Sequence, residues 1–336
     1  MVPAIFGLSG LALTCDERAF FADADPAGYI LFGRNVENPA QLRALTDALR
    51  AIHGRERLFI CIDQEGGRVA RMKPPAWPAY PTGEAFARLY DIAPASAIEA
   101  ARCNAEGLGL DLAEAGISVD CWPLLDVRQP GAHDVIGDRA LGDEPLRVAA
   151  LGRAILDGLG RAGIAGVVKH MPGHGRAMAD SHKELPTVTA GEAELERDIA
   201  PFRALAAAPI AMTAHIRYTA WDAAQPATQS PFVINEIIRG RIGFAGLLLT
   251  DDLDMEALSG TVPERAARSL AAGCDLALNC WAKMDDMTGI ARACPDLSAA
   301  AAQRLEVALA STGALVADPA RRDALAAKRD SLLALA

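Results

Sequence analysis

The chain has 336 residues, of which 51% are hydrophobic and 23% charged, a composition typical of a globular protein and not of a disordered one. Its formal net charge of −10 argues against nucleic acid or an anionic membrane as the main partner. No apolar run is long enough to span a bilayer. The apolar start Met1–Leu13 lacks Lys and Arg and is interrupted by two glycines. We therefore interpret Ala4–Leu8 as a first strand and not as part of a signal peptide.

The seven cysteines are odd in number and form no CxxC pair. Several lie in apolar runs such as Leu58–Ile62, where a thiol is expected to be buried. Buried free thiols are typical of a reducing compartment and not of a disulfide framework. We therefore expect a cytoplasmic location.

Short apolar runs alternate with segments of helical period along the chain. Eight runs are predicted to be strands: Ala4–Leu8, Gly28–Phe32, Leu58–Ile62, Ser118–Leu124, Gly166–His170, Pro209–Ala214, Gly246–Thr250 and Asp275–Asn279. Amphipathic or Ala-rich segments between them are predicted to be helices: Pro39–Ile52, Ala95–Ala115, Pro145–Arg161, Ala190–Leu205 and Phe232–Arg241. This alternation predicts parallel strands joined by crossover helices.

Eight such units favour a single closed (β/α)₈ barrel. An open doubly wound sheet is the alternative, but neither a GxGxxG motif nor a phosphate-binding loop follows the first strand. The Ala- and Leu-rich tail Asp296–Ala336 is expected to form helices that pack outside the barrel or cap it. Because no linker or low-complexity tract interrupts the chain, we expect one domain over residues 1–336.

Polar residues follow six of the predicted strands. They are Arg34-Asn35, Asp63-Gln64-Glu65, Asp126, Lys169-His170, His215 and Asp251-Asp252. In a (β/α)₈ barrel the C-terminal ends of the strands carry the active site. The sequence therefore predicts a functional site at this end of the barrel.

Two adjacent acids, Asp251 and Asp252, end the seventh predicted strand. Because side chains alternate along a strand, at most one of them can point toward the barrel axis. A carboxylate there can act as a nucleophile, a general base or a metal ligand, whereas the alternative is an N-cap for a short helix starting at Leu253. We favour a functional role for Asp251 and a structural role for Asp252.

The fifth predicted strand leads into a Gly-rich loop, Lys169-His170-Met171-Pro172-Gly173-His174-Gly175, which is followed by Asp180-Ser181-His182. A carboxylate two residues from an imidazole can fix the tautomer of His182 and support proton donation to a leaving oxygen near neutral pH. The alternative is a surface turn stabilised by an Asp–His contact. Glycines and alanines around the pair favour a mobile loop over the barrel mouth.

His170 and His174 are four residues apart, a spacing found in some zinc sites. Pro172 and Gly173 prevent the regular helix that this spacing needs, so we expect no metal there. Lys169 and His170 are better interpreted as donors to substrate hydroxyls.

The segment Asp63–Arg71 begins at a strand end and turns at two glycines. Asp63 can accept hydrogen bonds from sugar hydroxyls, and Arg71 can reach the same ring. The alternative is a β-turn with solvated charges. Ile136–Arg139 offers another loop arginine, which is ambiguous when taken alone.

Together these segments resemble glycoside hydrolase family 3. Four motifs occur in the family's order: Asp63–Arg71, Ile136–Arg139, Lys169–Gly175 with Asp180–Lys183, and Thr250–Met255. The similarity covers roughly residues 4 to 280 and is strongest to the bacterial β-N-acetylglucosaminidases that recycle peptidoglycan. The KHxPGHG motif with its downstream DSH is highly specific to this group.

The resemblance implies that Asp251 is the nucleophile, His182 the general acid/base and Asp180 its orienting partner. It places five residues at the family's sugar-binding positions: Asp63, Arg71, Arg139, Lys169 and His170. Members of this branch are single catalytic barrels that act without a metal or an organic cofactor. Residues from about 296 to 336 would then be a peripheral helical tail.

Two positions depart from the family pattern. Met171 lies where Phe is common, which we expect to change packing only. Asp254 lies where Ser is frequent and adds a third acid near Asp251. If Asp254 points inward, we expect it to raise the pKa of Asp251.

The resemblance predicts a retaining exo-β-N-acetylglucosaminidase that removes terminal N-acetylglucosamine from muropeptides. A phosphorylase of the same family is an alternative, because a neutral histidine repels phosphate less than a carboxylate does. A β-glucosidase is a further alternative. A non-catalytic sugar-binding protein on the same barrel is the alternative outside the enzymes.

Overall fold

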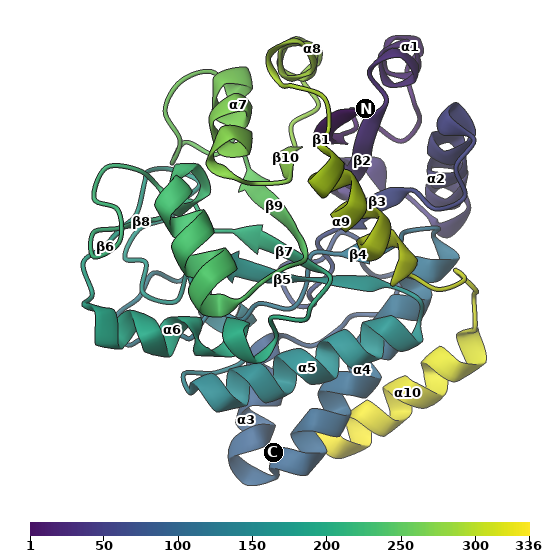
Figure 1. The fold of residues 1–336 in the computed structure, drawn as a ribbon. Helices are drawn as coiled ribbons and strands as arrows, with labels where there is room; N and C mark the ends of the chain where they lie inside the picture. The colour runs from purple at the N-terminus through teal and green to yellow at the C-terminus, as the bar shows by residue number, and fades with distance from the viewer.

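The computed structural model describes residues 1–336, and its centre is a closed barrel of eight parallel strands (Figure 1). The barrel strands are β1 (Val2–Gly7), β2 (Pro26–Leu31), β3 (Phe59–Ile62), β4 (Val119–Asp120), β5 (Ala165–Met171), β7 (Ile210–Thr213), β9 (Leu247–Asp252) and β10 (Leu276–Asn279). Each strand pairs with the next barrel strand along the chain, and β10 pairs with β1 to close the barrel. The predicted (β/α)₈ barrel is confirmed. Two short strands, β6 (Thr187–Val188) and β8 (Arg217–Tyr218), form a separate sheet.

Helices connect the strands and surround the barrel (Figure 1). They are α1 (Cys15–Ala24), α2 (Pro39–His53), α3 (Gly83–Ile92), α4 (Pro94–Glu114), α5 (Pro145–Arg161), α6 (Glu192–Ala204), α7 (Val262–Ala272) and α8 (Met284–Ala293). The predicted helix Pro145–Arg161 coincides with α5. The helices predicted at Pro39–Ile52, Ala95–Ala115 and Ala190–Leu205 agree with α2, α4 and α6 to within two residues.

Two predicted elements differ from the observed ones. The strand predicted over Ser118–Leu124 is limited to Val119–Asp120, because Trp122 donates its backbone N–H to the carbonyl oxygen of Asp120 and Pro123 has no N–H to donate. The segment predicted as an ordinary helix over Phe232–Arg241 is a π-helix, Val233–Ile242. Its backbone hydrogen bonds therefore reach back five residues where those of an α-helix reach back four.

Side chains of the barrel strands alternate between two apolar clusters. Phe59 and Cys61 on β3 belong to the cluster inside the barrel, as do Leu247 and Leu249 on β9. Ile60 and the other intervening residues belong to the cluster between the barrel and its helices. Both faces of each strand are buried, which explains why the strands have continuous apolar sequences.

The C-terminal tail forms two helices, α9 (Ala299–Ala310) and α10 (Pro319–Leu333). Leu305 and Ala308 of α9 belong to the inner cluster, so α9 covers the N-terminal end of the barrel. α10 packs along α4, where Arg322 pairs with Asp111 at 3.0 Å (Figure 1). This arrangement leaves the C-terminal ends of the strands free for a functional site.

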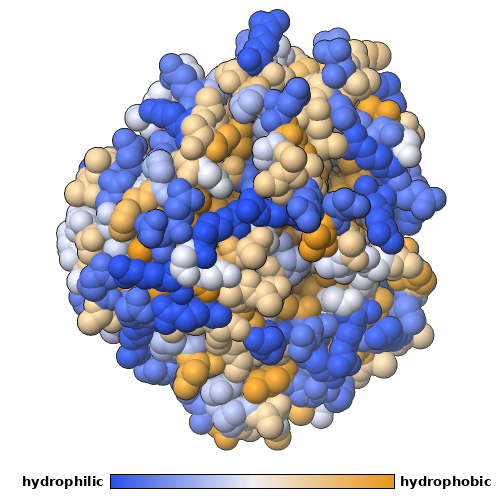
Figure 2. Space-filling model, in the orientation of Figure 1, coloured by the Kyte–Doolittle hydropathy of each residue, from blue (hydrophilic) through white to orange (hydrophobic).

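Polar and charged residues are mixed with small apolar patches over the face drawn in Figure 2. None of the helices combines the length and the apolar character needed to cross a bilayer.

Candidate active site

A cavity of about 200 Å³ lies at the C-terminal ends of the barrel strands. Seven of the eight predicted site residues line it: Asp63, Arg71, Arg139, Lys169, His170, His182 and Asp251. A larger cavity of about 490 Å³ lies at the opposite end beside α9, but nine of its twelve lining residues are hydrophobic and none is a strand-end polar group. The smaller, polar cavity is therefore the candidate active site.

The period of the strands places two of the carboxylates in this cavity. Leu247 and Leu249 face the barrel interior, so Asp251, two residues further along β9, faces the same way. Asp63 follows Cys61 of β3 by the same step of two. The carboxylates thus lie directly above the apolar inner cluster, where little water can screen them.

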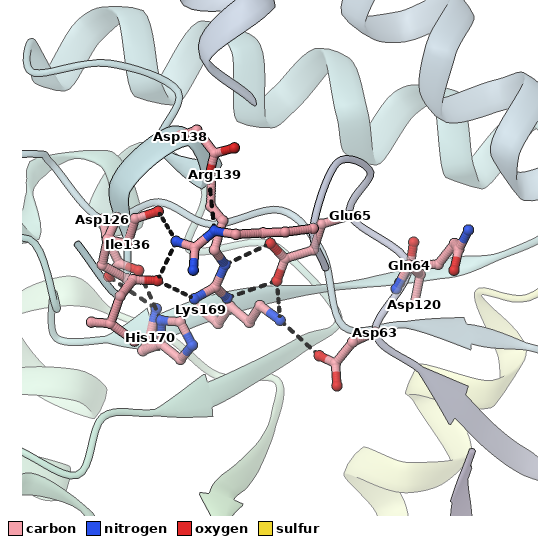
Figure 3. A network of polar contacts seen from close by, with 12 residues as sticks. Asp63, Gln64, Glu65, Asp120, Asp126, Ile136, Asp138, Arg139, Lys169 and His170 are labelled. Carbon is pink, nitrogen blue, oxygen red and sulfur yellow. Dashed lines mark hydrogen bonds and ion pairs between the residues drawn. The ribbon is translucent and has the colours of Figure 1, made fainter. Parts of the chain in front are cut away.

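A network of ion pairs forms one wall of the cavity (Figure 3). Lys169 Nζ lies 2.9 Å from Asp63 Oδ1 and 2.7 Å from Glu65 Oε1. Arg139 donates two hydrogen bonds of 2.8 Å to the two carboxylate oxygens of Glu65. Arg71 completes the network with a contact of 3.2 Å to Asp63 Oδ2. Three members of the network therefore make more than one contact: Lys169 with two carboxylates, Glu65 with Lys169 and Arg139, and Arg139 with both oxygens of Glu65.

Opposite charges keep the members of this network ionised. Burial alone would raise the pKa of Asp63, but Lys169 and Arg71 bring it well below its usual range. Burial alone would lower the pKa of Lys169, but Asp63 and Glu65 raise it well above its usual range. Fixed, charged donors and acceptors at one wall suit a ligand rich in hydroxyl groups.

A second group of contacts fixes His170. The Nδ1 atom of His170 lies 2.8 Å from Oδ2 of the fully buried Asp126. Asp126 Oδ1 accepts the backbone N–H groups of His170 at 3.1 Å and of His174 at 2.7 Å. With Nδ1 donating to a carboxylate, Nε2 of His170 is the nitrogen left for a ligand.

Asp251 has the ionisation state that a nucleophile needs. Burial alone would raise its pKa, but His170 and His215 lower it below its usual value. Oδ1 also accepts the backbone N–H of Asp252 at 2.8 Å, which orients the carboxylate. A buried, ionised and oriented carboxylate can attack an electrophilic carbon.

Asp254, the third acid of the segment Thr250–Met255, affects the pKa of Asp252 and not that of Asp251. Asp254 Oδ2 accepts hydrogen bonds from Asn279 Nδ2 at 2.8 Å and from the backbone of Cys280 at 3.0 Å. Burial and then the charge of Asp254 raise the pKa of Asp252 well above its usual range. The condition set for an effect of Asp254 on Asp251, that Asp254 points inward, is not met, because Asp254 is turned toward β10.

Asp180 and His182 form the carboxylate–imidazole pair expected from the sequence. His182 Nδ1 lies 2.8 Å from Asp180 Oδ1, which also accepts the backbone N–H of His182 at 3.0 Å. Burial would raise the pKa of Asp180, but the hydrogen bonds from His182 lower it below its usual value. Nε2 of His182 is then the nitrogen free to exchange a proton beside the cavity.

Sequence reasoning did not assign Glu65 and Asp126 to the site. Glu65 lies inside the strand-end segment Asp63–Arg71, and its partner Arg139 is 74 residues away. Asp126 was noted after the fourth predicted strand, and its partner His170 is 44 residues away. The strand-end position of both acids was the available signal, but their partners are set by the closing of the barrel.

Comparison with known proteins agrees with the observed fold. Residues 8–309 match the glycosyl hydrolase family 3 N-terminal domain. A beta-hexosaminidase of Alkalilimnicola ehrlichii is 41% identical over 283 residues, which are 83% of this chain and 80% of that protein. A beta-hexosaminidase of Aromatoleum aromaticum is 37% identical over 90% of this chain and 86% of its own length.

A crystal structure of NagZ from Neisseria gonorrhoeae in complex with N-trifluoroacetyl-D-glucosamine is similar to this chain over its whole length. The TM-score is 0.88 and the identity 32%, with 100% of this chain and 98% of the other covered. These similarities confirm that the protein is a glycoside hydrolase. The chain belongs to glycosyl hydrolase family 3.

Proposed function

We propose that this enzyme is a retaining exo-β-N-acetylglucosaminidase in which Asp251 is the nucleophile and His182 the general acid/base. The observation that carries the proposal is that the ionised Asp251 and His182, whose Nδ1 lies 2.8 Å from Asp180, line one cavity. Two relatives named beta-hexosaminidase, and a NagZ structure that contains N-trifluoroacetyl-D-glucosamine, support the substrate class.

The reaction has two steps. In the first, Asp251 attacks the anomeric carbon while protonated His182 gives its Nε2 proton to the departing glycosidic oxygen, which leaves a covalent glycosyl ester on Asp251. In the second, neutral His182 takes a proton from water as that water attacks the same carbon and displaces Asp251. Two inversions retain the β configuration, and both side chains return to their starting states.

Asp180 has a positioning role in this scheme. Its carboxylate holds Nδ1–H of His182, so that only Nε2 exchanges the proton with substrate and water. It also offsets the positive charge of the ring in the protonated state. The pair replaces the second carboxylate that most retaining glycosidases use.

The wall of ion pairs would bind the non-reducing sugar. Asp63 can accept hydrogen bonds from ring hydroxyls, while Lys169, Arg71 and Arg139 can donate them. With Nδ1–H of His170 donating to Asp126, its Nε2 can accept a hydrogen bond from a sugar hydroxyl. These contacts fix the anomeric carbon near Asp251.

We further propose that the natural substrates are muropeptide fragments with a terminal β-linked N-acetylglucosamine, hydrolysed in the cytoplasm. Arg68 and Arg71 at the cavity can attract an anionic muramyl group despite the net charge of −10. Free, buried cysteines such as Cys61 and Cys121 support a reducing compartment.

Hydrolysis of two 4-nitrophenyl glycosides, the β-N-acetylglucosaminide and the β-glucoside, with and without phosphate, tests the proposal. We expect turnover of the N-acetyl sugar alone, at a rate that phosphate does not change. A phosphate-dependent rate with release of a sugar 1-phosphate would indicate a phosphorylase. Faster turnover of the glucoside would indicate a β-glucosidase, and binding of N-acetylglucosamine without turnover would indicate a sugar-binding protein.

A further inference from the structure

His174 and Ser181 connect the end of β5 to the loop that carries the Asp180–His182 pair. His174 follows β5 by three residues, and Ser181 lies between the two members of the pair. The Nε2 atom of His174 shares a hydrogen bond of 3.2 Å with Ser181 Oγ. Both residues are buried, with exposed fractions of 3% and 2%, although His182 beside them is largely exposed.

His174 is held by Asp126, the same buried carboxylate that fixes His170. Asp126 Oδ1 accepts the backbone N–H of His174 at 2.7 Å, and Asp126 Oδ2 holds the ring of His170 at 2.8 Å. The two imidazole rings also meet edge to face, with centroids 5.5 Å apart. One buried carboxylate therefore holds His170 directly and Ser181 through His174.

The bond to Ser181 is the single hydrogen bond made by the ring of His174. Its Nδ1 atom is buried without a partner, and the ring does not line the cavity. Burial, with a smaller effect from His170, lowers the pKa of His174 to about 4, so the ring is neutral near neutral pH. The proposed reaction has no step for this ring, which leaves the contact with Ser181 as its function.

The backbone around His174 has little freedom to move with the loop. A Cβ atom on Gly175 would lie 1.9 Å from the carbonyl oxygen of Val127, so this segment passes very close to the chain after β4. Tyr218 donates a hydrogen bond of 2.7 Å to the carbonyl oxygen of Gly173. The backbone is thus held on both sides of His174. Ser181, although buried itself, belongs to the loop that carries the exposed His182.

We propose that His174 and Ser181 are positioning residues that hold the loop so that His182 reaches the glycosidic oxygen. The inference rests on the proposed function, because it needs His182 as the general acid/base. A general acid must lie within hydrogen-bond reach of the atom that it protonates. Because a displacement of about 1 Å can lower a rate on the order of 10²-fold, a single loop contact is enough to matter.

The test compares two aryl β-N-acetylglucosaminides, one with a phenol leaving group and one with 2,4-dinitrophenol. Phenol needs protonation as it departs and dinitrophenol does not. Ser181→Ala and His174→Phe should lower kcat/KM for the phenyl glycoside by about 10- to 100-fold and leave the dinitrophenyl glycoside nearly unchanged. His174→Gln should retain most activity, because the Gln amide reaches as far as Nε2.

Ser118→Ala is the matched control, since Ser118 is a buried residue just before β4, where its hydroxyl donates to the Leu58 carbonyl at 2.7 Å. It should change neither rate. Ser181→Ala added to His182→Ala should cause no further loss, because Ser181 acts through His182. Thermal unfolding of each variant checks that it is folded.

Three results would overturn the inference: unchanged rates in Ser181→Ala and His174→Phe, an equal loss on both glycosides, or a further loss in the double variant. Absence of turnover of either glycoside by the unmodified enzyme would instead overturn the proposed function, and this inference with it. The two failures are therefore distinguishable.

Discussion

Two carboxylate–imidazole pairs lie at the same end of the barrel and differ mainly in their surroundings. In Asp126–His170 and in Asp180–His182, Nδ1 lies 2.8 Å from a carboxylate oxygen. The side chains of the first pair are 0% and 8% exposed, whereas those of the second are 19% and 63% exposed. The buried pair is built into the barrel, and the exposed pair lies on a loop.

The proposed mechanism gives each pair a different task, and the surroundings of each pair fit that task. His170 is held by a buried carboxylate that also binds two backbone N–H groups, which suits a group that must keep a fixed position against a sugar. His182 is exposed beside the cavity, which suits a group that gives a proton to one oxygen and takes one from water. In this proposal, the environment of each histidine, and not the residue type, separates sugar binding from proton transfer.

Removing the carboxylate of Asp251, which lines the cavity together with His170 and His182, should have the largest effect. Asp251→Asn should lower kcat on the order of 10⁴-fold, because the amide cannot form the glycosyl ester. Steady-state kinetics with the 4-nitrophenyl N-acetylglucosaminide measure the loss. Asp285→Asn, an exposed residue of α8, should be unaffected. Near-normal turnover by Asp251→Asn would exclude it as the nucleophile.

Substituting each histidine in turn tests the two proposed roles separately. His182→Ala should lower kcat/KM by about 10²- to 10⁴-fold for the phenyl glycoside and far less for the dinitrophenyl one. His170→Ala should weaken the binding of both substrates to the same extent, mainly as a higher KM, because a contact with the sugar does not depend on the leaving group.

His53→Ala is the matched control for this pair of substitutions, since His53 contacts Asp25 at 3.2 Å outside the cavity. Its kinetics should be unchanged. A loss that depends on the leaving group in His170→Ala, and not in His182→Ala, would reverse the two roles.

Substituting the two carboxylates should separate stability from activity. Asp126→Asn should lower the free energy of unfolding by about 1.5–3 kcal/mol, because a buried carboxylate that accepts three hydrogen bonds loses its charge. Asp180→Asn should change it by less than about 0.5 kcal/mol and still lower activity. Urea unfolding provides the measurement, and equal stability losses in the two variants would contradict the contrast.

The pH dependence of stability should show the smallest effect. With the pKa of His174 lowered from 6.5 to about 4, the unfolded chain binds a proton between these values that the folded chain does not. Folding stability therefore rises with pH across this window and falls as pH drops toward 4, by at most about 1.4 kcal/mol per pH unit.

His174→Gln lacks this proton site and serves as the comparison. The difference in unfolding free energy between the unmodified enzyme and His174→Gln should shift in favour of the variant as pH falls from about 7 to 4. A difference that stays constant over this range would show that His174 does not titrate as its burial requires.

The barrel was predictable because its strands are buried on both faces. Continuous apolar runs such as Phe59–Ile62 mark them, and the polar residues that follow six of the eight runs mark the C-terminal end. The fourth strand was predicted too long because hydropathy does not register the missing N–H of Pro123. Two of the predicted helices, α2 and α5, combine a strong apolar period with a proline at their start.

The site was predictable where it depends on local pattern. Alternation along β9 places Asp251 on the same face as Leu247 and Leu249, and the two-residue spacing of Asp180 and His182 sets that pair. Contacts across the barrel were not predictable, because Lys169 and Asp63 are 106 residues apart. Nor did the sequence indicate that Asp254 is turned toward β10, since that orientation depends on the backbone of Cys280.

The configuration of the first product tests the central claim most directly. Proton NMR of 4-nitrophenyl β-N-acetylglucosaminide during the first minutes of cleavage resolves the two anomers before they interconvert. A retaining reaction through Asp251 predicts that the β anomer of N-acetylglucosamine appears first and that the α anomer follows by mutarotation. Initial formation of the α anomer would contradict a covalent intermediate on Asp251.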